Sequence, residues 1–236
     1  MNLPEVIVTL CERVRDAGGQ AWLVGGSVRD HLLGRSPKDL DVEVHRLAAD
    51  ALRPILRRLG HVKAVGRSFG VFKLRIRKRE YDVSLPQPGR ATTPQGEPIQ
   101  IAGDPFLGID EALRRRDLTI NAIAYDPLSD DYADPYDGRG DLQRRVLRAV
   151  DPTTFTDDPL RVLRVMQFAG RFDFSVDPAL VTLCRALPIA DLPGERLLTE
   201  FEKLLLRSAR PSVGVQAGVD LAIFSRLLPM LALPDG

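Results

Sequence analysis

The pattern of hydrophobic residues changes along the chain, and this change constrains the fold more than any other feature. Between residues 21 and 85, short segments either alternate apolar and polar side chains or form brief apolar runs, as β-strands do. From Pro159 onward, apolar residues recur every three or four positions, as on one face of an α-helix. The two patterns predict an α/β domain over residues 1–149, followed by an all-α region over residues 150–236.

Within the first region the elements are predicted to alternate. The expected elements are a helix over 3–17, strands over 21–24 and 40–44, a helix over 48–59, and a hairpin formed by 72–77 and 81–85. Residues 86–105 are rich in proline, glycine and small polar residues, which predicts a mobile connecting loop. Beyond Asp110 the strand pattern fades, and the later segments predict helices over 159–171, 178–187 and 195–208.

The charge balance excludes a chain that is basic throughout. Lys and Arg number 33 against 32 Asp and Glu, so the formal net charge is +1 and any surface for nucleic acid must be local. The stretch from Arg53 to Arg90 is such a local excess, because Glu80 and Asp82 are its only acids.

Two further features limit the class of protein. Cys11 and Cys184 lie far apart in the chain and form no Cys-x-x-Cys pair, which argues against a disulfide framework or a zinc site. No apolar run approaches the ~18 residues that a membrane span requires. We therefore expect a soluble cytoplasmic protein without a membrane partner, and no protein partner is evident.

Asp39 and Asp41 are candidate metal ligands. They lie two positions apart on a predicted strand, so both carboxylates would leave one face while Leu40 and Val42 face the core. Mg²⁺ needs only a few carboxylate oxygens when water and substrate phosphates complete its coordination. The alternative is a strand with a solvated acidic face.

A glycine turn precedes these acids. Gly25 and Gly26 follow a predicted strand and open a helix that Ser27 could cap, and Arg29 offers a fork for phosphate oxygens. Such a turn alone is often only a turn. Next to the acidic pair, it predicts a site for a nucleoside triphosphate.

Asp82 lies on the second strand of the predicted hairpin, where it could present a third carboxylate to the same cluster. Its expected role is to accept the proton of an attacking hydroxyl. The alternative is an ordinary strand acid near Lys78 and Arg79.

Five motifs occur in the order that one family shows. They are Leu23-Val24-Gly25-Gly26-Ser27-Val28-Arg29-Asp30, Asp39-Leu40-Asp41, Arg115-Arg116-Asp117-Leu118-Thr119-Ile120-Asn121-Ala122, Asp134-Pro135-Tyr136-Asp137-Gly138 and Asp157-Asp158-Pro159-Leu160-Arg161-Val162-Leu163-Arg164. In these motifs the chain resembles the class II tRNA nucleotidyltransferases, the superfamily of CCA-adding enzymes and bacterial poly(A) polymerases. The resemblance implies an α/β head with a polymerase-β-like nucleotidyltransferase sheet, followed by all-α neck and body helices.

The resemblance also implies roles for single residues. Asp39 and Asp41 would hold Mg²⁺, and Gly25, Gly26 and Arg29 would meet the triphosphate. The residues expected to grip the incoming nucleotide around its ribose and phosphates are Arg116, Asp117 and Asn121, and those expected to read its base are Asp158, Arg161 and Arg164. Residues 86–105 lie where the family has the flexible loop that is implicated in switching from C to A addition.

Chemistry alone supports base reading by an Asp–Arg set. Cytosine and adenine both place an exocyclic amino donor beside a ring-nitrogen acceptor, and a carboxylate and a guanidinium match this pair. Uracil and guanine instead place a carbonyl acceptor beside an N–H donor, which the same protein groups do not match. Asp158, Arg161 and Arg164 advance by three positions and would share one helix face. The alternatives are that Asp158, before Pro159, caps the helix and that the arginines form a solvated face.

The chain departs from the family in two respects. Gln167 stands where many relatives carry a further arginine, so that contribution is lost or has moved, for example to Arg171. The chain also ends at Gly236, before the usual body and tail, as either a truncated or a naturally minimal enzyme would.

The implied reaction is attack by the 3′-hydroxyl of an RNA on the α-phosphate of CTP or ATP, with two Mg²⁺ ions and release of pyrophosphate. The preferred expectation is addition of CCA to tRNA 3′ ends. A partial CC- or A-adding enzyme, a poly(A) polymerase and a non-catalytic RNA-binding module remain alternatives.

Overall fold

The computed structural model describes residues 1–236 except 38, 65–69, 89–90, 93–97, 100–101 and 229–236. The chain divides into two compact units, Met1–Arg115 with Asn121–Gly138, and Arg116–Ile120 with Arg139–Gly236. This division differs from the single boundary near residue 150 that the sequence predicts. The short segment 116–120 joins the second unit because Leu118 bridges to Ala149 and Thr119 Oγ1 donates to Asp141 Oδ2 at 2.7 Å.

A seven-stranded sheet of the order β3-β4-β5-β2-β1-β8-β9 forms the centre of the first unit. Its strands are β1 (Gln20–Val24), β2 (Asp41–His45), β3 (His61–Ala64), β4 (Val71–Ile76), β5 (Arg79–Ser84), β8 (Ala124–Asp126) and β9 (Asp131–Ala133). Strands β2 and β5 are parallel, and the other neighbouring pairs are antiparallel. The predicted hairpin is confirmed as β4 and β5.

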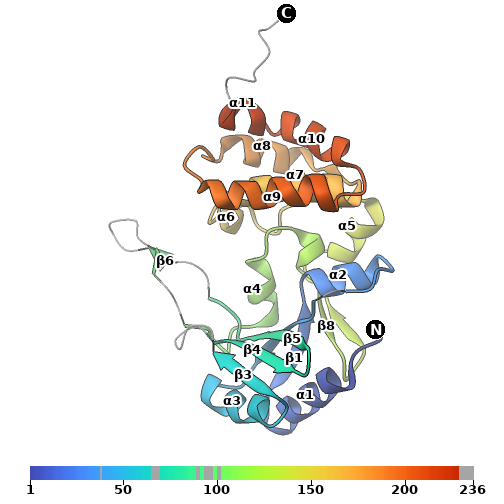
Figure 1. Ribbon diagram of the computed structural model, residues 1–236, viewed down its shortest axis with the longest axis vertical. Helices are drawn as coiled ribbons and strands as arrows, with labels where there is room; N and C mark the ends of the chain where they lie inside the picture. Colours follow the sequence, from blue (N-terminus) through green and yellow to red (C-terminus); the bar gives the residue numbers. More distant parts are fainter. Residues whose placement is uncertain (38, 65–69, 89–90, 93–97, 100–101, 229–236) are drawn as a thin grey trace, which may run out of the picture. The chain divides into compact units, whose positions relative to one another are not determined.

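The helices of the first unit are α1 (Glu5–Asp16), α2 (Gly26–Leu32), α3 (Ala49–Arg57) and α4 (Ile109–Arg114). Helices α1 and α3 lie side by side along one face of the sheet (Figure 1). The contact is direct, since the Arg53 guanidinium of α3 lies 5.9 Å from the ring centroid of Phe72 on β4. We call this side the core face, because it also buries Val42 and Val83 completely or nearly so.

Strand β2 differs from the predicted pattern in two ways. It begins at Asp41, so Asp39 lies in the bend before the strand rather than on it. Beyond Asp41 it is also buried on both faces, since Glu43 and His45 are buried like Val42 and Val44. The two polar side chains have buried partners, with Glu43 Oε1 3.1 Å from His45 Nε2 and His45 Nδ1 2.9 Å from the carbonyl oxygen of Leu107. The predicted alternation therefore applies only to the first part of the strand.

The prediction that strands end near Asp110 is wrong, because β8 and β9 complete the sheet. Each spans only three residues, too few for an alternating pattern to be visible in the sequence. Strand β3 was also not expected. Within the predicted mobile loop 86–105, β6 (Ala91–Thr92) and β7 (Pro98–Ile99) pair antiparallel, and its residues 89–90, 93–97 and 100–101 lie outside the described residues.

The second unit is mainly helical. Its helices are α5 (Gly138–Arg144), α6 (Pro152–Phe155), α7 (Arg161–Phe172), α8 (Pro178–Ala186), α9 (Gly194–Arg207), α10 (Pro211–Asp220) and α11 (Ile223–Leu227). The expectation of an all-α region needs one correction, since β10 (Val146–Leu147) and β11 (Ser175–Val176) form a small parallel ladder. Helix α7 is central and packs against both α9 and α10.

Both cysteines are free and buried, as the absence of a disulfide pattern predicts, and burial raises the pKa of each thiol to about 12. Of the helices in the described part of the chain, none combines the length and apolar character needed to cross a membrane.

Candidate functional site

Acidic side chains converge where β2 and β5 begin. Asp41 and Asp82 are directly paired residues of these parallel strands, and Lys73 on β4 is paired with Asp82. Paired residues project from the same face of a sheet. Because the neighbouring Val42 and Val83 point to the core face, Asp41 and Asp82 project from the opposite face, which we call the open face.

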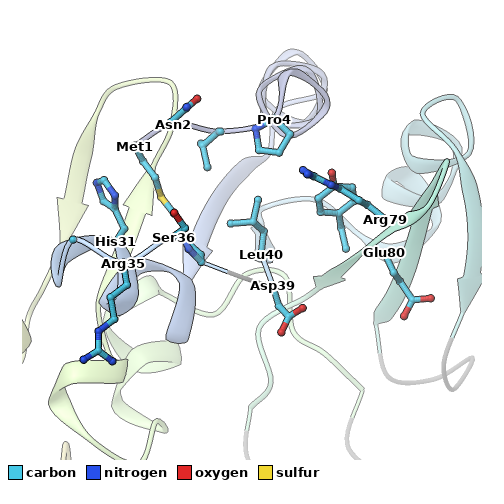
Figure 2. Close-up of a pocket in the computed structure, with 14 residues that line it drawn as sticks. Met1, Asn2, Pro4, His31, Arg35, Ser36, Asp39, Leu40, Arg79 and Glu80 are labelled. Atoms are coloured by element: carbon cyan, nitrogen blue, oxygen red, sulfur yellow. The ribbon is translucent and has the colours of Figure 1, made fainter. Parts of the chain in front are cut away.

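Asp39 extends this acidic group although it precedes the strand. In Figure 2 the carboxylates of Asp39 and Glu80 point to the same side, away from Pro4, whereas Leu40 points towards Pro4. Asp39 and Glu80 are also exposed to solvent. Sequence reasoning did not propose Glu80 as a site residue. The available signal was its position two residues before Asp82 on one strand, which places both on one face.

Lys73 neutralises part of this acidic group. Its Nζ donates to Glu80 Oε1 at 2.9 Å and to Asp82 Oδ1 at 3.1 Å. These hydrogen bonds raise the pKa of Lys73, and the bond from Lys73 lowers the pKa of Glu80. The basic partner of Asp82 is therefore Lys73 on the neighbouring strand β4. It is neither Lys78 nor Arg79, the basic neighbours that the sequence suggests.

The donor set fits a magnesium ion that shares its coordination with phosphates. Among the described residues no three His, Cys, Asp or Glu side chains form a complete metal-binding group. Mg²⁺ is commonly held by only one or two carboxylates, with water and substrate phosphates as its other ligands. Asp39 and Asp41 can supply those two carboxylates.

The glycine turn after β1 requires glycine at one position. Gly25 has φ 68° and ψ −130°, a conformation that side-chain-bearing residues rarely adopt, and it is the N-cap of α2. Ser27 does not cap this helix as expected, because its Oγ instead donates to the carbonyl oxygen of Val24 at 3.1 Å. A Cβ on Gly26 would lie 3.4 Å from Arg29 Nη2, which is an ordinary van der Waals contact, so packing does not itself require glycine at this position.

Arg29 is buried and held in a fixed orientation. Its Nε and Nη2 donate to Asp30 Oδ1 at 2.9 and 2.7 Å, and its Nη1 donates to Asn121 Oδ1. The structure therefore brings together Arg29 and Asn121, two predicted site residues that are far apart in the sequence.

Within the second unit, Asp117 and Arg164 form an ion pair. Arg164 Nε donates to Asp117 Oδ2 at 2.7 Å, and Asp117 Oδ1 accepts from the backbone N–H of Leu118 at 2.8 Å. Burial alone would lower the pKa of Arg164, but the adjacent Asp117 carboxylate outweighs it and the net shift is upward. The guanidinium also lies 5.1 Å from the ring centroid of Phe168, so several contacts fix its position.

Asp158 and Arg161 lie at the start of α7. Asp158 Oδ1 accepts from the Leu160 N–H at 3.2 Å, so it closes the turn before the helix rather than capping its first residue. Its Oδ2 accepts from Arg196 Nη2 on α9 at 2.8 Å, a partner that the sequence did not suggest. Arg161 Nη1 donates to the Thr154 carbonyl oxygen at 2.6 Å, and burial lowers its pKa.

The other positions singled out in the sequence also lie in the second unit. Arg116 is partly exposed in the segment that precedes Asp117. Gln167 is buried on α7, and its Nε2 has no hydrogen-bond partner among the described residues. Arg171, considered as a replacement for a family arginine, lies 5.1 Å from the Phe172 ring centroid.

An open cavity of about 910 Å³ adjoins the acidic group (Figure 2). It is lined by residues 1–4, by His31, residues 34–37, Asp39 and Leu40, and by residues 79–81 at the start of β5. Asp39 is the one predicted site residue among the lining residues of this cavity.

Comparisons with known proteins agree on one family. The family model described as the poly A polymerase head domain matches residues 21–148. A multifunctional CCA protein from Nitrosococcus oceani is 38% identical over 195 residues, which cover 79% of this chain and 45% of the relative. Another from Methylobacillus flagellatus is 39% identical over 215 residues, or 89% of this chain and 50% of the relative. The chain thus spans about half the length of these curated relatives.

Solved structures extend the likeness to the fold. A CCA-adding enzyme in complex with ATP matches 99% of this chain and 54% of its own, with a TM-score of 0.78 and 25% identity. The Bacillus stearothermophilus CCA-adding enzyme in complex with CTP matches 98% of this chain and 55% of its own, with a TM-score of 0.75 and 27% identity. A tRNA nucleotidyltransferase complexed with a primer tRNA and an incoming ATP analog matches 95% of this chain and 64% of its own, with a TM-score of 0.73 and 26% identity. These matches confirm the predicted α/β head with a polymerase-β-like sheet followed by helices.

Proposed function

The chain belongs to the family of CCA-adding enzymes and poly(A) polymerase head domains, and from this premise we propose that it is a template-independent RNA nucleotidyltransferase. It would add C and A residues from CTP and ATP to tRNA 3′ ends and release pyrophosphate. One observation carries the proposal, namely that Asp41 and Asp82 are paired residues of adjacent strands on one face of the sheet, with Asp39 in the bend that leads into β2. The names of the relatives, which refer to CCA addition, CTP, ATP and primer tRNA, support the choice of substrates.

In this proposal Asp39 and Asp41 hold Mg²⁺. When bound there, Mg²⁺ would supply charge neutralisation for the phosphates and favour the ionised form of the attacking hydroxyl. Asp82 would accept the proton of that hydroxyl, since its carboxylate lies on the strand directly beside Asp41. Lys73 keeps this carboxylate in place through its 3.1 Å hydrogen bond.

We assign phosphate binding to the turn between β1 and α2. Gly25 has a positive φ at the N-cap of α2, Gly26 is the first residue of that helix, and Arg29 offers a cation whose orientation is fixed by Asp30 and Asn121. A group that is already oriented needs little reorganisation when the substrate binds, which favours the reaction. Asn121 would therefore position Arg29 in addition to any contact of its own with the nucleotide.

We assign base selection to the second unit. Asp158 and Arg161 offer the acceptor and donor that suit the edges of cytosine and adenine, and each carboxylate oxygen can accept more than one hydrogen bond. An unmatched partner on uracil or guanine would cost about 1–3 kcal/mol, or on the order of tenfold to a hundredfold in discrimination. Asp117 orients Arg164 for the same task through their 2.7 Å contact, and Arg116 would assist in holding the nucleotide.

The test is incorporation of labelled nucleotides into a tRNA that lacks its CCA end, with CTP alone, ATP alone or both. The proposal predicts two additions with CTP, three with both nucleotides, and then a stop. A product that ends at CC, a single A or a long A tail would assign the chain to a CC-adding enzyme, an A-adding enzyme or a poly(A) polymerase. RNA binding without incorporation would leave a binding module and contradict the proposal.

A pair of variants ties this activity to the site. Replacing both ligands, Asp39→Asn with Asp41→Asn, is expected to abolish incorporation. The matched control, Glu12→Gln with Asp50→Asn, removes two exposed acids of α1 and α3 and should leave incorporation unchanged.

A further inference from the structure

On the open face of the sheet, positive and negative side chains lie on different strands. The paired residues of neighbouring strands form rows across the sheet. One row runs from Lys63 on β3 through Lys73 on β4 and Asp82 on β5 to Asp41 on β2. In the next row, Arg75 on β4 is paired with Glu80 on β5. On this face, β5 and β2 thus carry acids, and β3 and β4, towards the edge of the sheet, carry cations.

The outer cations are available to a ligand. Lys63 and Arg75 are exposed, and their charges help to lower the pKa of Glu80, but the hydrogen bonds to Glu80 and Asp82 come from Lys73. Lys63 is also directly opposite Lys73, and two like charges in such a pair destabilise a sheet. The core face of the same strands is apolar, with Phe72 and Leu74 buried. A destabilising cluster of cations beside an acidic centre is expected where a polyanion binds.

We propose that Lys63, Lys73 and Arg75, which we call the cationic strip, bind the phosphodiester backbone of the acceptor RNA strand. This inference rests on the proposed function and states by which path the RNA reaches the carboxylates. Neighbouring strands are about 4.8 Å apart, so β4 and β3 lie roughly 5 and 10 Å from β5. Phosphates that follow the rows from β3 to β5 would bring the terminal hydroxyl to Asp41 and Asp82.

The strand order separates this path from the site of the incoming nucleotide. The turn at Gly25 and the fixed Arg29 follow β1, which neighbours β2 on the side away from β5. The triphosphate and the RNA strand therefore approach the carboxylates from opposite sides along the sheet. This arrangement keeps two polyanions apart except at the reacting groups.

The test measures RNA affinity across a salt series and so does not depend on catalysis. The variant Lys63→Gln with Arg75→Gln removes the two exposed cations beside Lys73 but leaves Lys73 hydrogen-bonded to its acids. The control, Arg57→Gln with Arg58→Gln, removes two exposed cations at the end of α3, on the core-face side of the sheet. Both variants carry the same net charge, so a difference between them reports position and not total charge.

The probe is a fluorescent tRNA that lacks its CCA end, followed by anisotropy. Each lost contact to single-stranded phosphate reduces the slope of log affinity against log salt by about 0.7, so we expect the slope to fall by about 1.4. The dissociation constant at low salt should rise by roughly tenfold, and the KM for tRNA should rise while the KM for CTP is unchanged. The control variant should match the unmodified protein in all of these.

The outcomes separate the inference from the proposed function. If the unmodified protein extends tRNA but the strip variant keeps its affinity and salt slope, the path is wrong and the function stands. If the unmodified protein neither binds nor extends tRNA, both fail. Folding is checked by thermal melting, where relief of the Lys63–Lys73 pair should leave the Tm unchanged or higher. Should the double variant unfold, Lys63→Gln alone must still lower the slope by about 0.7.

Discussion

Among single residues, Lys73 has the most consequential position, because one ammonium group holds two carboxylates of the acidic group. It keeps Glu80 and Asp82 in place with hydrogen bonds of 2.9 and 3.1 Å. It also limits the repulsion among the acids, which would otherwise disfavour several charges on one small face. The residue thus belongs both to the carboxylate site and to the proposed cationic strip.

The consequence can be measured as a titration. Hydrogen bonding to Lys73 lowers the pKa of Glu80, so Lys73→Gln should raise that pKa towards the ordinary value of a glutamate. The pKa of Glu80 can be followed by the ¹³C chemical shift of its side-chain carboxyl group across pH, with an exposed acid such as Glu12 as the internal control. An unchanged Glu80 titration would show that the hydrogen bond is not populated in solution.

At the residue scale, local motifs predicted the site better than they predicted its partners. Gly25, Asp39 and Asp41 are recognisable because a glycine turn, a helix start and an acidic pair at the start of a strand follow one another closely in the chain. The bonds from Arg29 to Asn121 and from Arg196 to Asp158 join residues that are distant in sequence. Such contacts depend on how the elements pack, which a single sequence does not display. Glu80 was missed for a different reason, because the sequence predicts the second hairpin strand from residue 81, whereas β5 begins at Arg79 and includes Glu80.

At the scale of elements, the crossing of α7 and α10 depends on two glycines. A Cβ added to Gly214 would lie 2.8 Å from the Met166 carbonyl oxygen and 3.1 Å from the Gly170 Cα. The helix axes can approach closely there only because both positions lack side chains. This contact supports α7, the helix that carries Arg161 and Arg164.

Gly214→Ala should therefore destabilise the protein by about 1–3 kcal/mol, because overlap with the backbone of α7 outweighs the better helix propensity of alanine. Urea unfolding followed by circular dichroism gives this free energy. Gly194→Ala is the matched control, since Gly194 begins α9 and a Cβ there meets nothing within 4 Å. A Gly214→Ala variant as stable as the control would contradict the packing described for this crossing.

The element pattern was predictable where hydrophobic periodicity was long and regular. The hairpin of β4 and β5 and the helices α1, α7, α8 and α9 lie close to their predicted bounds. The errors have physical causes. Strands β8 and β9 are too short to show alternation, and β2 is covered on both faces. Helix α10 buries Gly214, Ala217 and Gly218, so no row of large apolar residues marks its buried face in the sequence.

At the scale of the whole molecule, the predicted functional residues are divided between the two units. The first unit contains Asp39, Asp41, Asp82, Arg29 and Asn121, and the second contains Arg116, Asp117, Asp158, Arg161 and Arg164. The chain spans about half the length of its curated relatives. A measurement on the carboxylate site alone therefore tests the account more directly than one that requires the complete reaction.

That measurement is the binding of Mn²⁺, as a paramagnetic substitute for Mg²⁺, in the presence of CTP, followed by electron paramagnetic resonance. The protein should bind Mn²⁺ with CTP, and Asp39→Asn with Asp41→Asn should weaken this binding by at least about tenfold, or about 1.4 kcal/mol. The control Glu12→Gln with Asp50→Asn should bind as the unmodified protein does. Equal Mn²⁺ binding by all three proteins would contradict the assignment of the metal site to the start of β2.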